Sequence, residues 1–417
     1  MSSTVSMLAN PEVGSTRVFE LPGLYGPFTF PEKLLQKIWF RRSFQDTAAC
    51  TVDGRRITLL QSGKWNLLGG PDFKNARLRF GDGPEMVGDV EIHLHAVDWL
   101  AHHHADDIAY DRVILHVVLF APPSGHVTRS RSGAEIPVLV LLPLLHHDLE
   151  EYAAEEAIEQ LANRPAAQIV ERLGPLPFEE VNSLLRAHAE QRWAQKVRYA
   201  SIRIQKLGWI EACHQTAMDI MGYRFNRAPM LRAATLVPFA HWRDGGLDLE
   251  ALFKTVGGWS LQGQRPANHP RLRLHQYSTW VAQRPRWPDT LTELAQSLPR
   301  SNPEAATGDF RRRAELPLLR ETWTMALTGG AIRGTRFDNL LTDGFFPLLA
   351  ANGTPGLRDF WFHWLVGDVP PLWRQALREL EVFSGRARPA CHGMTQGLLG
   401  WLIERERSAL VAKGRSA

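Results

Sequence analysis

The spacing of apolar residues changes near Pro143, and this change constrains the fold more than any other feature of the sequence. From Met86 to Ala96 apolar and polar residues alternate strictly, which is typical of a strand with one buried face. Val113–Phe120 is an apolar run interrupted only by His116, which is typical of a central strand buried on both faces. Beyond Pro143 the apolar residues fall at helical spacing. We therefore predict an α+β protein, with an N-terminal mixed α/β domain followed by a mostly helical C-terminal region.

The chain divides into three predicted parts: a disordered tail over residues 1–16, an α/β domain over 17–145 and a helical domain over 146–417. Its 417 residues are enough for about two or three domains. In the α/β domain, the spacing of Leu34 and Ile38 predicts a helix over 31–44. The rest of this domain is predicted as a hairpin over 51–61, strands over 73–80, 86–96, 113–120 and 136–142, and a polar loop over 122–133.

The C-terminal region is predicted as a series of helices separated by proline and glycine. The expected helices span 149–161, 178–207, 209–221, 228–239, 247–256, 275–282, 290–298, 317–326, 336–349, 371–382 and 395–404.

Cysteine usage and charge limit the class of protein. The three cysteines lie far apart, which argues against a disulfide framework and against a cysteine-ligated zinc site. The N-terminus lacks the pattern of a signal peptide, and no apolar stretch approaches the roughly 20 residues of a membrane helix. We expect a cytoplasmic protein without a membrane partner. The net charge of +4 permits nucleic acid as a partner without requiring it, and the oligomeric state stays open.

Two acidic residues occupy positions where chemistry is expected. Asp72 follows two glycines and Pro71 at the start of a predicted strand, and Glu91 shares the polar face of the next strand with His93. Carboxylates on a strand are costly unless they are paired or used. An Asp from one strand and a Glu from its neighbour are suited to binding Mg²⁺ or Mn²⁺ through oxygen.

This arrangement resembles the PD-(D/E)XK nuclease superfamily over roughly residues 31–142. Pro71-Asp72 and Glu91-Ile92-His93 match its motif, and the preceding helix would supply Glu32. The resemblance implies a restriction-endonuclease-like core in which Asp72 and Glu91 bind the metal, His93 serves as a further ligand or as a base that positions water, and DNA or RNA is cleaved. The sequence departs from the pattern at His93, which stands where the superfamily has Lys. Lys74, or Lys64, would then supply the missing positive charge.

Histidines are concentrated in the same segment and allow a different hypothesis. Six of the 16 histidines fall between His93 and His116. His93, His95, His102 and His104 form a candidate site for Zn²⁺ or Fe²⁺, because imidazole nitrogen suits transition metals. The structural alternative places residues 102–104 in a solvated turn and makes His116 a core histidine bonded to the backbone.

A longer set of motifs resembles an uncharacterised bacterial family, the domain of unknown function 2851. The motifs include Gly70-Pro71-Asp72-Phe73, Gly88-Asp89-Val90-Glu91-Ile92-His93, Asp98-Trp99, Ile114-Leu115-His116-Val117-Val118, Arg265-Pro266-Ala267-Asn268 and Gln396-Gly397-Leu398-Leu399. They extend over nearly the whole chain. The resemblance implies membership of a family without an established activity.

Two features of the helical region are candidate ligand contacts. Arg265 and Asn268 lie in a rigid turn that could bind a phosphate of the substrate, or could serve as an interdomain turn with Asn268 capping the backbone. Lys196, Arg198, Arg203 and Lys206 could form a basic helix face against a nucleic-acid backbone, or a solvated face.

The sequence therefore leaves three functional hypotheses. The first is a metal-dependent nuclease-like enzyme with Asp72, Glu91, His93 and Lys74 in its site. The second is a histidine-based transition-metal hydrolase. The third is a non-catalytic module in which a degenerate nuclease-like core binds nucleic acid or protein.

Overall fold

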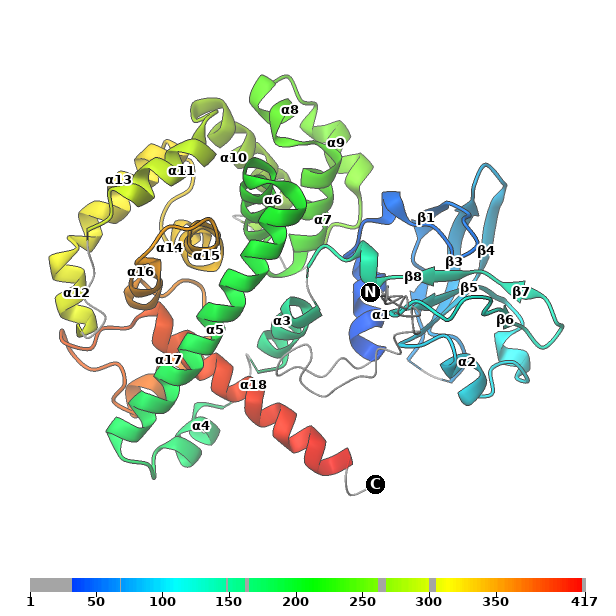
Figure 1. Ribbon diagram of the computed structural model, residues 1–417, viewed down its shortest axis with the longest axis horizontal. Helices are drawn as coiled ribbons and strands as arrows, with labels where there is room; N and C mark the ends of the chain where they lie inside the picture. Colours follow the sequence, from blue (N-terminus) through cyan, green and yellow to red (C-terminus); the bar gives the residue numbers. More distant parts are fainter. Residues whose placement is uncertain are drawn as a thin grey trace, which may run out of the picture.

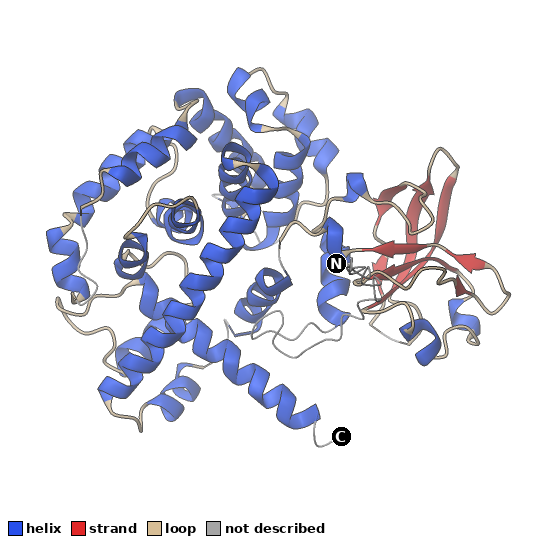
Figure 2. Cartoon of the chain, viewed as in Figure 1, coloured by secondary structure: helices blue, strands red, loops and turns tan. Residues whose placement is uncertain are grey.

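The computed structural model describes residues 32–67, 69–147, 149–161, 165–261, 268–299 and 305–414. A β-sheet lies at one end of the molecule and helices form most of the remainder (Figure 1, Figure 2). The predicted organisation, with an N-terminal sheet domain followed by a mostly helical region, is confirmed. The tail predicted over residues 1–16, residues 17–31 of the predicted α/β domain, and Arg265 lie outside the described residues.

The main sheet is mixed, with antiparallel strands on one side and parallel strands on the other. Its strands are β1 (Ile57–Gln61), β2 (Lys64–Trp65), β3 (Phe73–Phe80), β4 (Glu85–His93), β5 (Val113–Val118) and β8 (Val138–Val140). Their order is β1-β3-β4-β5-β8, and β2 pairs with β3. The β1–β3 and β3–β4 pairs are antiparallel, whereas the β4–β5 and β5–β8 pairs are parallel.

One face of the sheet packs against helix α1 (Glu32–Arg41). Leu35 and Trp39 of α1 are fully buried with Val90 and Ile92 of β4, which lie on the apolar face that strand alternation predicts. Burial of each such large side chain stabilises the fold by about 1.5–3 kcal/mol. Strands β4 and β5 approach closely at Gly88, where an added Cβ would lie 2.4 Å from a methyl carbon of Ile114.

The opposite face of the sheet is covered by short elements that the sequence did not reveal. These are helix α2 (Asp98–Ala101), the 3₁₀ turn η2 (Ile108–Tyr110), and a small hairpin formed by β6 (Thr128–Arg129) and β7 (Glu135–Ile136). Residues 122–133 were predicted as a loop, but they contain β6. Two-residue strands are too short to show a hydrophobic period, so their pairing is decided by contacts distant in sequence.

The helical region includes long helices and many short ones. These are α3 (Leu149–Leu161), α4 (Ala166–Leu173), α5 (Phe178–Leu207), α6 (Trp209–Met221), α7 (Tyr223–Leu236), α8 (Phe239–Asp244), α9 (Leu249–Val256), α10 (Pro270–Gln283), α11 (Trp287–Gln296), α12 (Thr307–Arg313), α13 (Leu316–Thr328), α14 (Thr335–Asn339), the π-helical turn η5 (Leu340–Phe345), α15 (Phe346–Ala351), α16 (Leu357–His363), α17 (Pro371–Glu379) and α18 (His392–Gly414). Helices α3, α5 and α6 have the predicted bounds, whereas α4, α8, α12 and α16 were not predicted. No helix among the described residues is long and apolar enough to cross a membrane.

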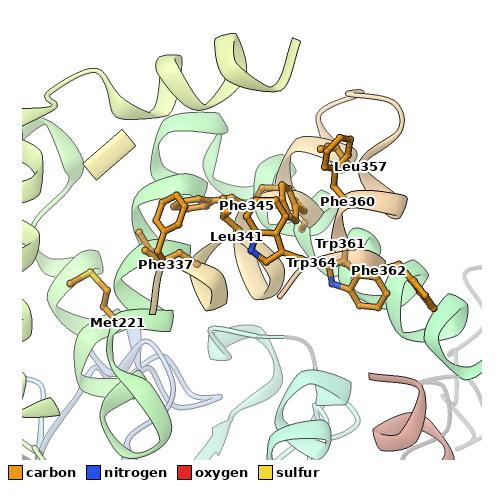
Figure 3. Close-up of a cluster of buried hydrophobic side chains, with 14 of the residues drawn as sticks. Met221, Phe337, Leu341, Phe345, Leu357, Phe360, Trp361, Phe362 and Trp364 are labelled. Atoms are coloured by element: carbon orange, nitrogen blue, oxygen red, sulfur yellow. The ribbon is translucent and has the colours of Figure 1, made fainter. Parts of the chain in front are cut away.

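A core rich in aromatic residues holds these helices together. Phe337, Phe345, Trp361 and Trp364 are buried at the centre of the cluster drawn in Figure 3. The long helix α5 crosses α18 (Figure 1). Gly397 of α18 permits the close approach, because a Cβ there would lie 2.0 Å from the backbone oxygen of Leu185.

Hydrogen bonds join the sheet domain to the helical region. Arg232 of α7 is buried, and its Nη1 donates to the backbone oxygens of Arg41 and Arg42 at the end of α1, at 3.2 and 2.8 Å. Tyr152 of α3 donates its hydroxyl to the backbone oxygen of Ser43. The end of α1 is therefore fixed by residues of two helices that follow the sheet.

Candidate metal centre

The structure brings Asp72 and Glu91 together at the point where β3 begins beside β4. The backbone N–H of Asp72 donates to Glu91 Oε2 at 3.0 Å, and the backbone N–H of Ile92 donates to Asp72 Oδ2 at 3.2 Å. Gln36 of α1 donates its side-chain amide to Asp72 Oδ1 at 2.6 Å. Each carboxylate is thus oriented by the neighbouring strand, and Asp72 also by the helix below the sheet.

Burial controls the charge of this acidic pair. It raises the pKa of Glu91 to about 8, to which the nearby carboxylate of Glu32 contributes. Burial, together with the charge of Glu91, raises the pKa of Asp72 to about 7. The pKa of Glu32 is also raised, mainly by burial. Without a cation the pair therefore holds protons near neutrality, and a divalent ion bound between the carboxylates would release them.

Three imidazoles surround the free side of Glu91. Its Oε1 lies 3.5 Å from His93 Nε2 and 3.3 Å from His104 Nε2. One nitrogen from each of His93, His102 and His104 can serve as a ligand atom, and these atoms all lie within 4.8 Å of one another. His102 and His104 follow α2, and the chain turns between them at His103, whose φ of 58° is in the left-handed region.

A chain of hydrogen bonds fixes the orientation of His93. Its Nδ1 lies 2.9 Å from Nε2 of His116, whose Nδ1 lies 3.1 Å from the hydroxyl of Thr128. That hydroxyl lies 3.3 Å from Nε2 of His126. Two directions of donation satisfy all three contacts, and a metal ligand at Nε2 of His93 requires the one in which His93 donates to His116, His116 to Thr128, and Thr128 to His126. Nε2 of His93 is then unprotonated and directs a lone pair toward Glu91 and His102.

The buried imidazoles are held in the neutral form. Burial, assisted by the neighbouring His116, lowers the pKa of His93 to about 2, and burial lowers that of His116 to about 3. The pKa of His104 is also lowered by burial. Neutral imidazole is the form that binds a metal ion.

These residues fit a divalent transition metal. Nε2 of His104 is buried without a hydrogen-bond partner, which is costly unless a ligand occupies that position. Imidazole nitrogens together with a carboxylate oxygen suit Zn²⁺, Fe²⁺ or Mn²⁺, whereas Mg²⁺ is usually bound by oxygen alone. The contact of His93 with His116, which is in turn held by Thr128, is of the kind that orients metal ligands in proteins.

The other predicted site residues lie elsewhere. His95 stacks on Phe120, at a centroid distance of 5.0 Å, and is not part of the histidine group that could hold an ion in the described structure. Lys74 is exposed on β3 and forms no ion pair with Asp72 or Glu91 in the part of the chain that is described. Asn268 accepts hydrogen bonds from Arg273 and Arg336 at 2.6 and 3.3 Å, within the helical region.

Sequence reasoning missed four residues of the centre: Gln36, Tyr110, His116 and Thr128. His116 is buried as expected, but its ring contacts His93 and Thr128 rather than the backbone. His116 lies opposite Glu91 in the β4–β5 register, and this position would have indicated its role. The register cannot be read from the sequence before the strand pairing is known. Tyr110 stacks on His104 at a centroid distance of 3.8 Å and so encloses the centre.

The motifs that form this centre are those of a known family. The family described as Protein of unknown function (DUF2851) matches residues 32–259, which is more than half of the chain. The chain belongs to this family. The match includes α1, the whole sheet and helices α3 to α9, so the DUF2851 region contains every residue of the candidate centre. No curated protein and no solved structure matches the chain.

Proposed function

We propose that this DUF2851 protein is a metal-dependent hydrolase that cleaves phosphodiester bonds of DNA or RNA. The observation on which the proposal depends is the convergence of two buried carboxylates and three imidazoles at one end of β4. Buried ionisable groups with opposed pKa shifts are typical of reactive sites. In the candidate metal centre, the raised pKa values of Asp72 and Glu91 favour the protonated acids, and the lowered pKa of His93 favours the neutral imidazole.

The order of the elements around the acidic pair supports a nuclease-like core. Helix α1 supplies Glu32, Asp72 lies at the start of β3, and Glu91 lies on the antiparallel neighbour β4. This is the layout that the resemblance to the PD-(D/E)XK superfamily implies. His93 takes the position of the superfamily's Lys, and its neutral ring would add a nitrogen ligand to the acidic pair.

The residues of the centre have distinct roles in this proposal. Glu91, His93 and His104 hold the ion, with His102 as the exposed fourth ligand. A divalent cation there would activate water and neutralise charge on a phosphoryl group. Asp72, whose backbone N–H donates to Glu91, would lie beside the ion as a carboxylate that can accept a proton from the attacking water. Tyr110 and Trp99 limit the access of solvent to the rings of the histidines.

Exposed cations beside the acidic pair support nucleic acid as the substrate class. Lys64 of β2 and Lys74 of β3 are both exposed and are direct partners across the two strands. Like charges placed opposite each other on a sheet are unfavourable unless an anion binds between them. Arg79 is a further exposed cation on β3, whereas Arg77 is paired with Glu85. A phosphate backbone would neutralise the exposed cations while one phosphodiester lies at Asp72.

The decisive experiment combines metal analysis with cleavage. The purified protein is analysed for bound metal and then assayed on single- and double-stranded DNA and RNA with Mn²⁺, Zn²⁺, Fe²⁺ or Mg²⁺. We expect cleavage with an ion that accepts nitrogen ligands, and a loss of about 100-fold or more in Glu91→Gln. Asp82→Asn is the matched control, because Asp82 is an exposed carboxylate in the turn between β3 and β4.

Two results would contradict the proposal. Cleavage that is equal in Glu91→Gln and in the native protein would come from a contaminant or from another site. Binding of nucleic acid without cleavage under any of these ions would instead favour a non-catalytic module.

A further inference from the structure

A second group of buried charges lies in the helical region, where α3, α5 and α6 meet η5 and α15. A small cavity of about 50 Å³, partly open to solvent, lies there. Its polar lining comes from Glu151, Arg192, Lys196, Arg203, Thr216 and Asp343. None of these residues belongs to the metal centre, so any ligand of this cavity would be separate from the metal ion.

Arg192 is the unusual residue of this cavity. It is only 7% exposed, and its Nε and Nη2 donate to a single acceptor, Oε1 of Gln396, at 3.3 and 3.4 Å. No carboxylate pairs with Arg192 in the described part of the chain. A buried guanidinium without a counter-ion is costly, because the charge loses its hydration and gains no opposite charge in return.

The other charges of the cavity balance one another. Lys196 forms an ion pair with Asp343 at 2.9 Å, and Arg203 one with Glu151 at 3.6 Å. Arg203 also donates to the hydroxyl of Thr216 at 2.8 Å, which holds it against the wall. In the lining itself three cations face two carboxylates, and Arg192 is the cation that has no direct ion pair among the described residues.

Beyond the lining, Asp219 and Glu155 pair with Arg227, and Glu151 also contacts His147. His392 of α18 is influenced by the charges of Asp343, Lys196 and Arg192, and it is buried with both ring nitrogens lacking a hydrogen-bond partner. Burial lowers its pKa to about 3, so the ring is neutral near pH 7. The ring of His392 therefore adds no charge that would balance Arg192.

We propose that this cavity binds a phosphate group. Arg192, Lys196 and Arg203 are separated by four and seven residues on α5, so they lie along one face of the helix. The guanidinium of Arg192 offers paired donors of the kind that bind phosphate oxygens, and Lys196 adds a point charge.

The proposal does not depend on the metal centre, and its test omits metal. The full chain, in buffer with a chelator, is titrated by calorimetry with inorganic phosphate and, separately, with a 5′-mononucleotide. We expect saturable binding of phosphate that Arg192→Gln weakens about tenfold or more. Tighter binding of the nucleotide would indicate that the phosphate belongs to a nucleotide, and equal binding that phosphate alone is recognised; both support the site.

A variant that is expected to strengthen phosphate binding complements Arg192→Gln. Asp343→Asn removes the carboxylate that competes for Lys196, so phosphate should bind about threefold tighter or more. Lys254→Gln, an exposed position on α9, should leave the affinity unchanged. If Arg192→Gln does not fold, as circular dichroism would show, Lys196→Gln replaces it and is expected to weaken binding. Absence of saturable phosphate binding, or equal affinity in the native protein, Asp343→Asn and the weakened variant, would overturn the proposal.

Discussion

The sheet domain and the helical region both bury ionisable side chains, but with opposite excess charge. In the metal centre, Asp72 and Glu91 are carboxylates without a cation, and the neighbouring imidazoles are neutral. In the helical cavity, Lys196 and Arg203 are paired, and Arg192 is a cation without an anion. In the two proposals above, the sign of the uncompensated charge in each site sets the sign of its ligand. The first site is suited to a cation and the second to an anion.

The largest expected effect concerns a histidine that has no hydrogen-bond partner on its buried nitrogen. His104→Ala should weaken metal binding about 100-fold, because Nε2 of His104 is a ligand candidate beside Glu91. The measurement is the dissociation constant of Zn²⁺ and of Mn²⁺ from a competition titration. The matched control is His103→Asn on the same loop, since His103 is exposed and Asn tolerates its left-handed φ of 58°. Equal metal affinities of His104→Ala and His103→Asn would contradict the proposed metal centre, because the imidazole of His104 would then not bind the ion.

A smaller effect is expected from a residue that contacts no metal. Thr128→Val removes the hydroxyl that His116 donates to, so His116 can no longer hold His93 in one tautomer. We expect a loss of about tenfold in metal affinity, with the fold retained. Thr128→Ser should restore the native affinity, which separates an orienting hydrogen bond from a packing effect. A native affinity in Thr128→Val would show that the hydrogen-bond chain does not position His93.

The smallest expected effect is on stability, and its sign follows from the raised pKa of Glu91. Between the ordinary pKa of a glutamate and about 8, the unfolded chain is ionised while native Glu91 keeps its proton. The free energy of unfolding therefore decreases as pH rises toward 8. Above about pH 6.5 the buried histidines no longer oppose this trend, since the unfolded histidines are then neutral as well.

For the metal-free protein we expect a decrease of about 1–2 kcal/mol between pH 6.5 and 8.5, measured by urea unfolding. Glu91→Gln should flatten the curve, and bound Zn²⁺ should reverse its slope because metal binding favours the deprotonated carboxylate. A native curve that is flat or rises over this range would mean that Glu91 is already ionised. The difference in charge that we infer between the metal centre and the helical cavity would then be wrong.

Several local elements could be predicted from the sequence because their signals are short in range. The alternation through Val90 and Ile92 identified the buried face of β4, and helical spacing identified α3, α5 and α6. The small hairpin β6–β7 and the short helices α4 and α16 were missed, because segments of two to eight residues contain too few repeats of a period. The helix predicted over residues 336–349 is interrupted by η5, a π-helical turn that no local pattern indicates.

The candidate centre was predicted in part for the same reason. Asp72 and Glu91 stand out as acids at the start of a strand and on a strand face, and the histidine-rich loop stands out by composition. His95 was grouped with His93 by alternation, but β4 ends at His93 and His95 turns toward Phe120. Gln36 and Thr128 gave no signal, because their relevance depends on which strands and helices lie beside one another.

By itself the sequence determined where strands give way to helices, which strand faces are buried, and which acids lie near the histidines. These properties depend on periods of two and 3.6 residues and on neighbours in the chain. The tertiary structure alone decided that His116 supports His93 from the adjacent strand, and that Arg192 lies against Gln396, 204 residues away, with no carboxylate partner among the described residues. Such charge environments arise from contacts distant in sequence, because burial and pairing depend on all the elements that surround a side chain.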